Sequence, residues 1–431
     1  MSKNVFVGVG FSKDDDSFKA GKEAAEVALK KCGNKPVISF VFYVGKYDAY
    51  KLNDGIKSIL DGTEFVGGST DAVAYEDQVV NKGVLVVSMY SNYLHVGVAS
   101  ADNISSDPYG VSKKNMMEAL KKLTMDKYLD SYLMFSRMKT GNVQGLVKIP
   151  SFFVFLFSRG FRLPSMGEET KIIKGVADVV GLHIPIYGGS FGVPLQDVFS
   201  GQKYDIYTLH SGKVMKDGLI AVFASCGLIY GSSIAHGCKP TEDMGFISGC
   251  LNDGYVVSEI SHKNSIEWYS EMIDKDKDDF MKNLMMYTQQ YPLGLPDNYG
   301  NFVIRAGGVP FEDKLAYVAP FIKGLPVFIM DGDQKNLLEA ADEIYNDITN
   351  YTNEDSAPAV CFSVLCGSRR VVLKDKMQTE LKSLKKSFKG APVVGFFSFG
   401  EIGSKPGLPP NFQHLSNSVF VIYDKLLNQL K

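Results

Sequence analysis

The chain has 431 residues, and a single hydrophobic core rarely extends over so many, so we expect two domains, or three at most. Hydrophobic residues make up 45% of the chain and charged residues 22%, which is typical of a folded globular protein rather than a disordered one. The formal net charge of −2 gives no electrostatic reason to bind nucleic acid or an anionic membrane surface, so neither is an expected partner.

The first residues and the cysteines favour a cytoplasmic protein. The opening MSKNVFVGVGFSKDDD contains neither the long apolar segment nor the small-residue cleavage site of a secretory signal. The longest lipid-like run, FFVFLF at residues 152–157, is too short to cross a bilayer, so we expect no membrane insertion. Six cysteines are too sparse for a disulfide framework in a chain of this size, and we expect reduced thiols.

The predicted elements begin with a strand, a helix and a second strand. Residues 5–10 form a short Val-rich run, residues 17–31 have an apolar helical stripe, and residues 37–44 (VISFVFYV) are continuously apolar. A continuous apolar run, unlike an alternating one, indicates a strand that is covered on both faces. This pattern predicts a parallel or mixed α/β sheet.

A strand–helix–strand unit followed by a return strand is used about three times along the chain. In each copy an apolar run leads to a helix and then to a second strand, which ends in a glycine-rich turn. The copies begin near residues 38, 152 and 359, and the steps from Phe155 to Gly188 and from Phe362 to Gly395 both span 33 residues. We therefore expect mixed β-sheets with packed helices, built from internal repeats.

Residues 236–356, between the second and third copies, have a different pattern. They contain a strand pattern (GYVVSEIS), a helix pattern (NSIEWYSEMI) and a mixed-charge stretch at 274–290 that is typical of a solvated helix face. The turn-rich YPLGLP at 291–296 is a natural boundary or pocket rim. No low-complexity linker separates the two halves, so the sequence predicts two closely associated domains.

The glycine-rich turns are candidate ligand-binding positions. They are GGST at residues 67–70, GGSF at 188–191 and GFFSFGEIG at 395–403. In open α/β sheets, ligands bind at strand ends, where backbone donors and helix termini converge. The alternative is that the glycines only allow a tight reversal of the chain.

The sequence contains no complete cofactor or metal motif. GVGFSK at residues 8–13 follows a predicted strand, but Lys13 occupies the third glycine position of a dinucleotide fingerprint. The six histidines form no H-x-x-x-H pair, and HGC at residues 236–238 is the nearest approach to a ligand pair. DGDQKN at 331–336 lacks the glycine of a calcium loop. We therefore expect no cofactor and no metal site.

A serine hydrolase is the catalytic alternative. Ser69 and Ser190 follow glycine pairs, but GGST and GGSF differ from the G-x-S-x-G elbow, and no histidine is fixed beside either serine by the sequence. An amide or ester hydrolase would need a base within hydrogen-bond reach of the hydroxyl. We predict no catalytic residues; a hydrolase and an adaptor with a decayed pocket are the two alternatives to a binding module.

Three polar residues beside apolar strands favour a pocket for a small zwitterion or carboxylate. Arg305 ends the strand-like run NFVIR, where its guanidinium could face a carboxylate of a ligand or form an internal salt bridge. Glu401 follows the third glycine turn and could meet an ammonium group, and Ser398 beside it could donate its hydroxyl.

The order of these motifs resembles the paired FIST domains of sensory proteins. The resemblance extends from about residue 4 to residue 424 and rests on FVGGST followed by YE, IYGGSFGVPLQD, HGCKP, VVSEISHKNSIEWY, YPLGL followed by NFVIR, and GFFSFGEIGS. Two positions depart from the family pattern: Gly68 stands in place of a cysteine, and an insertion precedes Asp197.

The resemblance implies a FIST N-like α/β domain over residues 1–232 and a FIST C-like α/β domain over residues 233–431. It implies a cytoplasmic sensory module in signal transduction, with amino acids or related small carboxylates as the ligand class. Because both domains occupy the chain, the output is expected through a downstream signalling partner. The predicted ligand-binding residues are Ser69, Thr70, Gly188, Gly189, Ser190, Arg305, Ser398 and Glu401.

Overall fold

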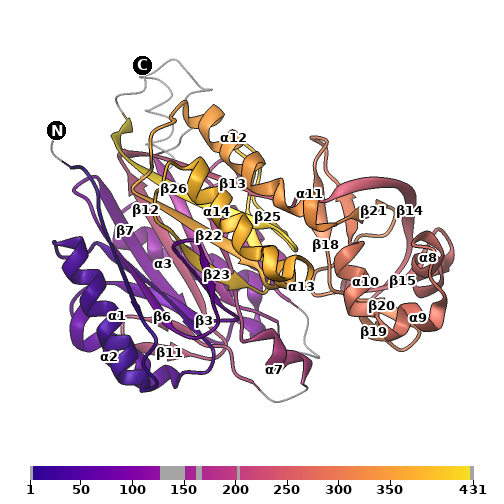
Figure 1. Ribbon diagram of the computed structural model, residues 1–431, viewed down its shortest axis with the longest axis horizontal. Coiled ribbons are helices and arrows are strands. Elements are labelled where there is room, and N and C mark those ends of the chain that lie inside the picture. The colour runs from indigo at the N-terminus through magenta and orange to yellow at the C-terminus, as the bar shows by residue number, and fades with distance from the viewer. Residues whose placement is uncertain (1–2, 127–150, 162–166, 201–203, 428–431) are drawn as a thin grey trace.

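The computed structural model describes residues 3–126, 151–161, 167–200 and 204–427. Within these residues, four β-sheets with packed helices form a large body and a smaller lobe (Figure 1). The lobe consists of residues 239–331 and lies beside the body, on the right in Figure 1. This mixed α/β architecture confirms the predicted fold class. No helix in the described ranges combines the length and the apolar character needed to cross a bilayer.

Each of the three sheets in the body has six strands, and all three share one strand order. The first contains β1 (Phe6–Ser12), β6 (Val84–Tyr90), β2 (Ile38–Val44), β3 (Phe65–Thr70), β10 (Thr208–His210) and β11 (Lys213–Met215). The second contains β7 (Leu94–Ala101), β12 (Leu219–Cys226), β8 (Phe152–Arg159), β9 (Ile186–Phe191), β24 (Glu401–Gly403) and β25 (Asn411–Gln413). The third contains β13 (Leu228–Ala235), β26 (Asn417–Leu426), β22 (Val360–Cys366), β23 (Val393–Ser398), β4 (Val73–Tyr75) and β5 (Gln78–Val80).

The repeated unit predicted from the sequence is the centre of each of these sheets. The pairs β2/β3, β8/β9 and β22/β23 are parallel, and the return strands β6, β12 and β26 pair antiparallel beside them. The three repeats therefore form three separate sheets. The predicted domain boundary between residues 232 and 233 lies inside β13, and the division at that point stays a prediction.

The repeats are interlocked by exchanged hairpins. β10 and β11 follow β9 in the chain, but β10 pairs with β3 of the first sheet. In the same way β24 follows β23 and pairs with β9, and β4 follows β3 and pairs with β23. Each glycine-rich turn is thus the point at which the chain crosses from its own sheet to a neighbouring one.

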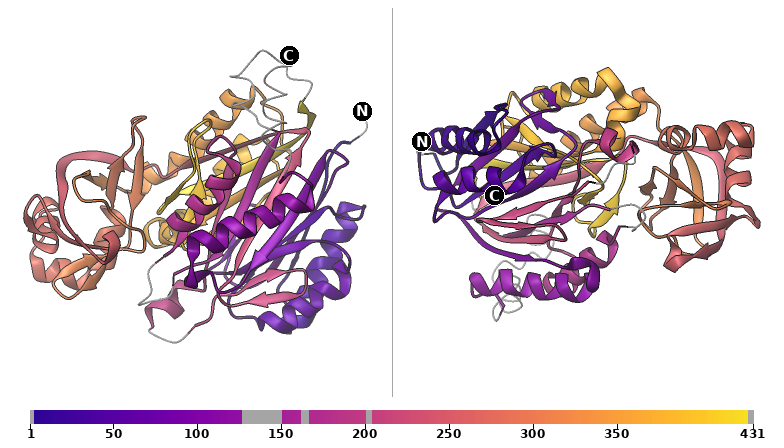
Figure 2. Two further views of the ribbon diagram at one scale, coloured as in Figure 1. Left: turned by 180° about the vertical axis from the view of Figure 1, so that it is seen from behind. Right: turned by 90° about the horizontal axis from the view of Figure 1, so that it is seen from below.

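Helices cover the outer faces of the sheets on several sides of the body (Figure 2). They are α1 (Ser17–Cys32), α2 (Ala49–Leu60), α3 (Pro108–Lys122), α6 (Glu169–Val180), α12 (Ala340–Thr352) and α14 (Met377–Ser387). The GVG motif at the start of the chain serves this packing. A Cβ on Gly10 would lie 1.9 Å from the carbonyl oxygen of Ala24, so glycine is required for β1 to approach α1.

The body has an aromatic core where the inner faces of its three sheets meet. Phe40, Phe155 and Phe362 occupy equivalent positions in β2, β8 and β22, each one residue before the partner of a turn glycine. Their ring centroids are 4.9, 5.2 and 6.1 Å apart, in edge-to-face arrangements. Such pairs contribute about 0.5–1.5 kcal/mol each beyond the burial of their area.

The lobe contains an eight-stranded antiparallel sheet and three helices. The mixed-charge stretch forms two helices rather than one, α9 (Lys277–Lys282) and α10 (Leu284–Gln290), and the turn predicted at residues 291–296 contains strand β17 (Leu293–Pro296). The remaining elements are α8 (Ser265–Met272), β14 (Lys239–Leu251), β15 (Val256–Ile260), β16 (Lys263–Asn264), β18 (Phe302–Arg305), β19 (Val309–Phe311), β20 (Lys314–Ala316) and β21 (Pro326–Asp331). Short helices α7 (Leu195–Phe199), α11 (Gln334–Leu338) and α13 (Gly367–Leu373) lie in the body.

Candidate functional site

The turns that follow β3, β9 and β23 meet where the three six-stranded sheets join. The Thr70 hydroxyl donates a hydrogen bond to a main-chain carbonyl of β23 (2.5 Å). The Ser190 N–H donates to the carbonyl of Gly400 (2.9 Å), and the Gly192 N–H donates to the carbonyl of Ser69 (3.0 Å). The structure therefore brings the three predicted glycine-rich turns into one junction.

Several of the predicted ligand-binding residues have their hydrogen bonds inside this junction. Ser69 has no exposed surface, and its hydroxyl accepts a hydrogen bond from the Tyr207 N–H (3.0 Å). Gly188 has a φ of 149°, and a Cβ there would lie 2.0 Å from the carbonyl oxygen of Leu156. Gly189 packs against Ser398: a Cβ added to Gly189 would lie 3.4 Å from the Cβ of Ser398. These groups hold the crossing chains together.

A cavity of about 100 Å³ lies beside the junction, between the body and the lobe. Its walls come from α7, α10, the β18–β19 connection, the turn between β22 and α13, and the end of β25. Figure 1 shows α10, β18, β25 and α13 where the lobe meets the body. Most of the lining is apolar, with Met285, Val309, Val318 and Phe399 among the side chains, and Ser398 is the predicted ligand-binding residue that lines it.

Two buried side chains on this cavity have polar atoms without a partner. Gln289 is 2% exposed, and its Oε1 has no hydrogen-bond partner among the residues that the structure describes. His414 is 4% exposed; its Nδ1 accepts a hydrogen bond from the Ala306 N–H (3.4 Å), and its Nε2 has no partner within the described ranges. A buried polar atom without a partner costs free energy, so both atoms favour a polar ligand in the cavity.

The His414 ring is a neutral hydrogen-bond donor. Burial, together with the positive charge of Arg305, lowers the pKa of His414 to about 3. Because Nδ1 accepts a hydrogen bond from the main chain, the ring proton resides on Nε2. Among side-chain atoms without a described partner, the lining residues therefore carry one donor, His414 Nε2–H, and one acceptor, Gln289 Oε1.

Arg305 lies directly behind this wall as a buried cation. Its Nη1 donates to the carbonyl oxygens of Phe412 (2.8 Å) and Ile304 (3.3 Å), and no ion pair to a carboxylate is found for it among the described residues. Burial lowers the pKa of Arg305 to about 10, so the guanidinium remains charged at neutral pH. The internal salt bridge that was the alternative for Arg305 is not formed within the described part of the chain, and a buried unpaired charge favours an anion nearby.

Glu401 reaches the cavity only through Ser398. Its Oε2 accepts hydrogen bonds from the Ser416 N–H (3.2 Å) and hydroxyl (2.8 Å), and its Oε1 is hydrogen-bonded to Ser398. Burial raises the pKa of Glu401 to about 8, so the carboxyl is neutral at pH 7. The Ser398 hydroxyl also donates to the carbonyl of Leu365 (3.2 Å), which leaves its oxygen free to accept the proton of Glu401. Glu401 thus positions the serine.

Ser190 has a similar carboxyl partner. Its hydroxyl donates to Oε1 of Glu169 (2.6 Å), and burial raises the pKa of Glu169 to about 7. Ser190 has no exposed surface and Glu169 is 2% exposed. Of the two serines of the hydrolase alternative, Ser190 therefore has a carboxyl beside it, whereas the Ser69 hydroxyl is bonded to the Tyr207 N–H, and both serines are fully buried.

The sequence matches two models of known protein families. A FIST N domain model matches residues 38–263, and a FIST C domain model matches residues 265–404. The chain belongs to the FIST family. FIST domains are generally sensory modules of signal transduction that bind small ligands. The FIST C match contains Gln289, Arg305, Ser398 and Glu401, whereas His414 follows it.

Other comparisons add little to the FIST assignment. No curated protein matches the sequence. Among solved structures, cyanuric acid hydrolase from A. caulinodans is 8% identical, covers 97% of this chain and 99% of its own, and has a TM-score of 0.39. PurL of T. maritima complexed with ADP is 11% identical over 97% of this chain and 72% of its own, with a TM-score of 0.22. Likenesses at this level carry no argument about function.

Proposed function

We propose that this FIST protein is a sensory module that binds a small amino acid or related carboxylate in the cavity between body and lobe. The observation that carries the proposal is the cavity whose lining residues Gln289 and His414 each carry a buried polar atom without a partner among the described residues. The buried Arg305 behind the same wall adds a positive charge that no described carboxylate balances.

The groups around the cavity are complementary to a zwitterion. A carboxylate can accept a hydrogen bond from His414 Nε2–H and is attracted by Arg305, and an ammonium group can donate to Gln289 Oε1. The apolar walls suit a short aliphatic side chain. A cavity of 150 Å³ holds benzene, which has six non-hydrogen atoms, so a cavity of about 100 Å³ suits a smaller ligand of roughly four or five non-hydrogen atoms, such as glycine.

The position of the cavity supports a sensory role. Its walls come from the body and from the lobe, so a bound ligand touches both. A ligand that contacts both parts favours the arrangement in which both sets of contacts are made, and a partner protein can read that arrangement. The output goes to a downstream signalling protein, in the cytoplasm.

Thermal unfolding in the presence of a matched panel tests the proposal. Glycine and alanine supply both charges, acetate supplies the carboxylate alone, and methylamine supplies the ammonium alone. A ligand that binds only the folded state adds about 2.7 kcal/mol of stability at a hundredfold excess over Kd, which is a clear rise in Tm. We expect the amino acids to raise Tm more than either single-charge probe.

Gln289→Met and Thr208→Val make the test specific for the cavity. Gln289→Met removes the unpartnered oxygen while keeping the volume, so it should preserve folding and abolish the shift. Thr208 is also fully buried with a hydroxyl that lacks a partner among the described residues, but it lies in β10, away from the cavity. Thr208→Val should retain the shift. A flat panel with the wild-type protein, or an unchanged shift in Gln289→Met, would exclude ligand binding at this cavity.

A further inference from the structure

We propose a second binding site, for a small organic amine, in a polar cavity on the opposite side of β18 and β25 from the first. This cavity has a volume of about 360 Å³ and is lined by the segment after β13, the turn before β18, β25 and the segment after β24. The HGCKP motif, for which the sequence suggested no ligand, forms part of its wall. None of the residues that line this cavity lines the first one.

Three residues that line this cavity carry a hydrogen-bond acceptor without a described partner. The acceptors are Oε1 of Gln413, Oδ1 of Asn411 and Nδ1 of His236, none of which has a partner within the described ranges. Gln413 is 5% exposed, so its amide oxygen cannot be satisfied by bulk solvent. Three acceptors without donors in one cavity call for a ligand that donates several hydrogen bonds, and an ammonium group donates three.

His236 is an acceptor because its ring is neutral. Burial lowers the pKa of His236 to about 4, although Glu343 and a hydrogen bond to the main chain of Phe302 act in the opposite direction. Since Nδ1 is the ring nitrogen without a described partner, the bond to Phe302 uses Nε2, which then carries the proton. Nδ1 is left with an unused lone pair on a residue that lines the cavity.

The charged side chains of the cavity are already engaged and leave these acceptors free. Lys405 is paired with Glu343 and lies 3.8 Å from Asp347. The Asp297 carboxylate accepts hydrogen bonds from the N–H groups of Tyr299 and Asn301, both at 2.8 Å. The charged lining is balanced, because Lys239 and Lys405 stand against Asp297 and Glu343, so the preference for a hydrogen-bond donor comes from the neutral acceptors.

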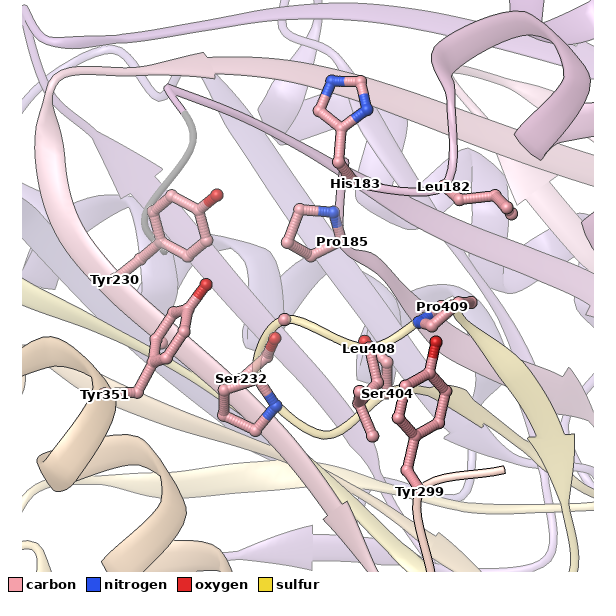
Figure 3. Close-up of a pocket in the computed structure, with 13 residues that line it drawn as sticks. Leu182, His183, Pro185, Tyr230, Ser232, Tyr299, Tyr351, Ser404, Leu408 and Pro409 are labelled. Carbon is pink, nitrogen blue, oxygen red and sulfur yellow. The ribbon is translucent and has the colours of Figure 1, made fainter. Parts of the chain in front are cut away.

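An adjoining pocket suits an apolar tail on the amine. It has a volume of about 220 Å³ and shares Tyr299, Leu408 and Pro409 with the polar cavity. Figure 3 shows Tyr230 and Tyr351 on one side of this pocket and Tyr299 on the other, with the segment that carries Ser404, Leu408 and Pro409 between them. Aromatic and proline faces of this kind pack against an apolar group. The two pockets together fit an amine with an aromatic or alkyl tail.

Calorimetric titration with 2-phenylethylamine tests the site, with 3-phenylpropionate as a probe of similar shape and opposite charge. We expect the amine to bind the wild-type protein and the acid to bind at least tenfold more weakly. Gln413→Met should weaken amine binding at least tenfold while Tm stays within a few degrees of the wild type, because it removes a buried oxygen that has no described partner. Thr208→Val should bind the amine as the wild type does.

Two further results keep the proposal falsifiable. Tyr299 is 63% exposed, so Tyr299→Ala should fold even if Gln413→Met does not, and it should weaken the amine severalfold. Loss of amine binding in Gln289→Met but not in Gln413→Met would place the amine in the first cavity and overturn the proposal. Equal binding of the acid and the amine, or no binding of the amine at millimolar concentration, would also overturn it.

Discussion

Replacing Glu401 by Gln should make the protein more stable at alkaline pH. The protonated carboxyl accepts two hydrogen bonds from Ser416 through Oε2 and can donate its proton to Ser398 through Oε1. A glutamine amide has the same shape and reproduces both roles, because its oxygen can accept from Ser416 and its NH₂ can donate to Ser398. Glu401→Gln therefore keeps the structure of the protonated state and removes only the ability to ionise.

The magnitude follows from the difference between the folded and unfolded protein. Burial raises the pKa of Glu401 from its ordinary value of 4.5 to about 8. Between these values the folded protein keeps a proton that the unfolded chain has released, so the free energy of unfolding falls as the pH rises. The fall is about 1.4 kcal/mol per pH unit well below pH 8 and halves at pH 8, where the carboxyl is half ionised, so it amounts to about 1.6 kcal/mol between pH 6.5 and pH 8.

The histidines define the pH window for the measurement. Burial lowers the pKa of His414 to about 3 and that of His236 to about 4. Below pH 6.5, the ordinary pKa of histidine, these two residues therefore bind protons in the unfolded chain but not in the folded protein. Their effect destabilises the protein as the pH falls below 6.5 and is absent above it. Between pH 6.5 and 8 the Glu401 contribution is therefore free of these two residues.

Urea denaturation at half-unit steps from pH 6.5 to 8 measures the effect. The stability of Glu401→Gln relative to the wild type should rise by about 1.6 kcal/mol across this range. Glu118, which is half exposed on α3, supplies the control, since Glu118→Gln makes the same change of residue without burial. If the curves of Glu401→Gln and the wild type run parallel, Glu401 is not held neutral and the description of the Ser398–Glu401 pair is wrong.

Three other substitutions test the fold. Arg369→Leu leaves the buried Glu380 without its partner at 2.9 Å and should cost about 3–5 kcal/mol, measured by urea denaturation. Phe155→Ala removes one ring of the central aromatic cluster and should cost about 3–5 kcal/mol, whereas a loss below 1 kcal/mol would show that the three sheets do not meet there. Gly10→Val places side-chain atoms against the Ala24 carbonyl, so it should lower Tm markedly and reduce soluble expression; an unchanged Tm would contradict the packing of β1 on α1.

The repeated units could be predicted because their signal is local. A strand buried on both faces is a continuous apolar run, and the same run recurs before each glycine-rich turn, as in residues 38–44 and 152–157. The exchange of hairpins could not be predicted in this way. Val73 pairs with Phe396, more than 300 residues away in the sequence. No feature of the sequence of residues 73–80 indicates which sheet these residues join.

The candidate site shows the same limit at the level of single residues. Arg305 and Ser398 could be predicted, because a polar residue beside an apolar strand is visible in the sequence. Gln289 and His414 could not, because nothing around them in the sequence distinguishes them from surface residues. Their importance comes from burial without a described partner, which only the packing of lobe against body creates. Glu401 was expected to meet an ammonium group, but its protonation is likewise a consequence of burial.

The two cavities share one structural element, so the two proposed ligands would act on the same part of the fold. Adjacent residues of an extended chain point to opposite faces, so Gln413 lines the polar cavity while His414 lines the first one. The same segment joins body to lobe, since the His414 N–H donates to the carbonyl of Ile304 (3.3 Å) and Arg305 donates to the carbonyl of Phe412 (2.8 Å). A ligand in either cavity therefore acts on the same contact between β18 and β25. Because binding free energies are linked reciprocally, a ligand in one cavity that changes this contact would change the affinity of the second ligand, and the second ligand would change the affinity of the first by the same factor.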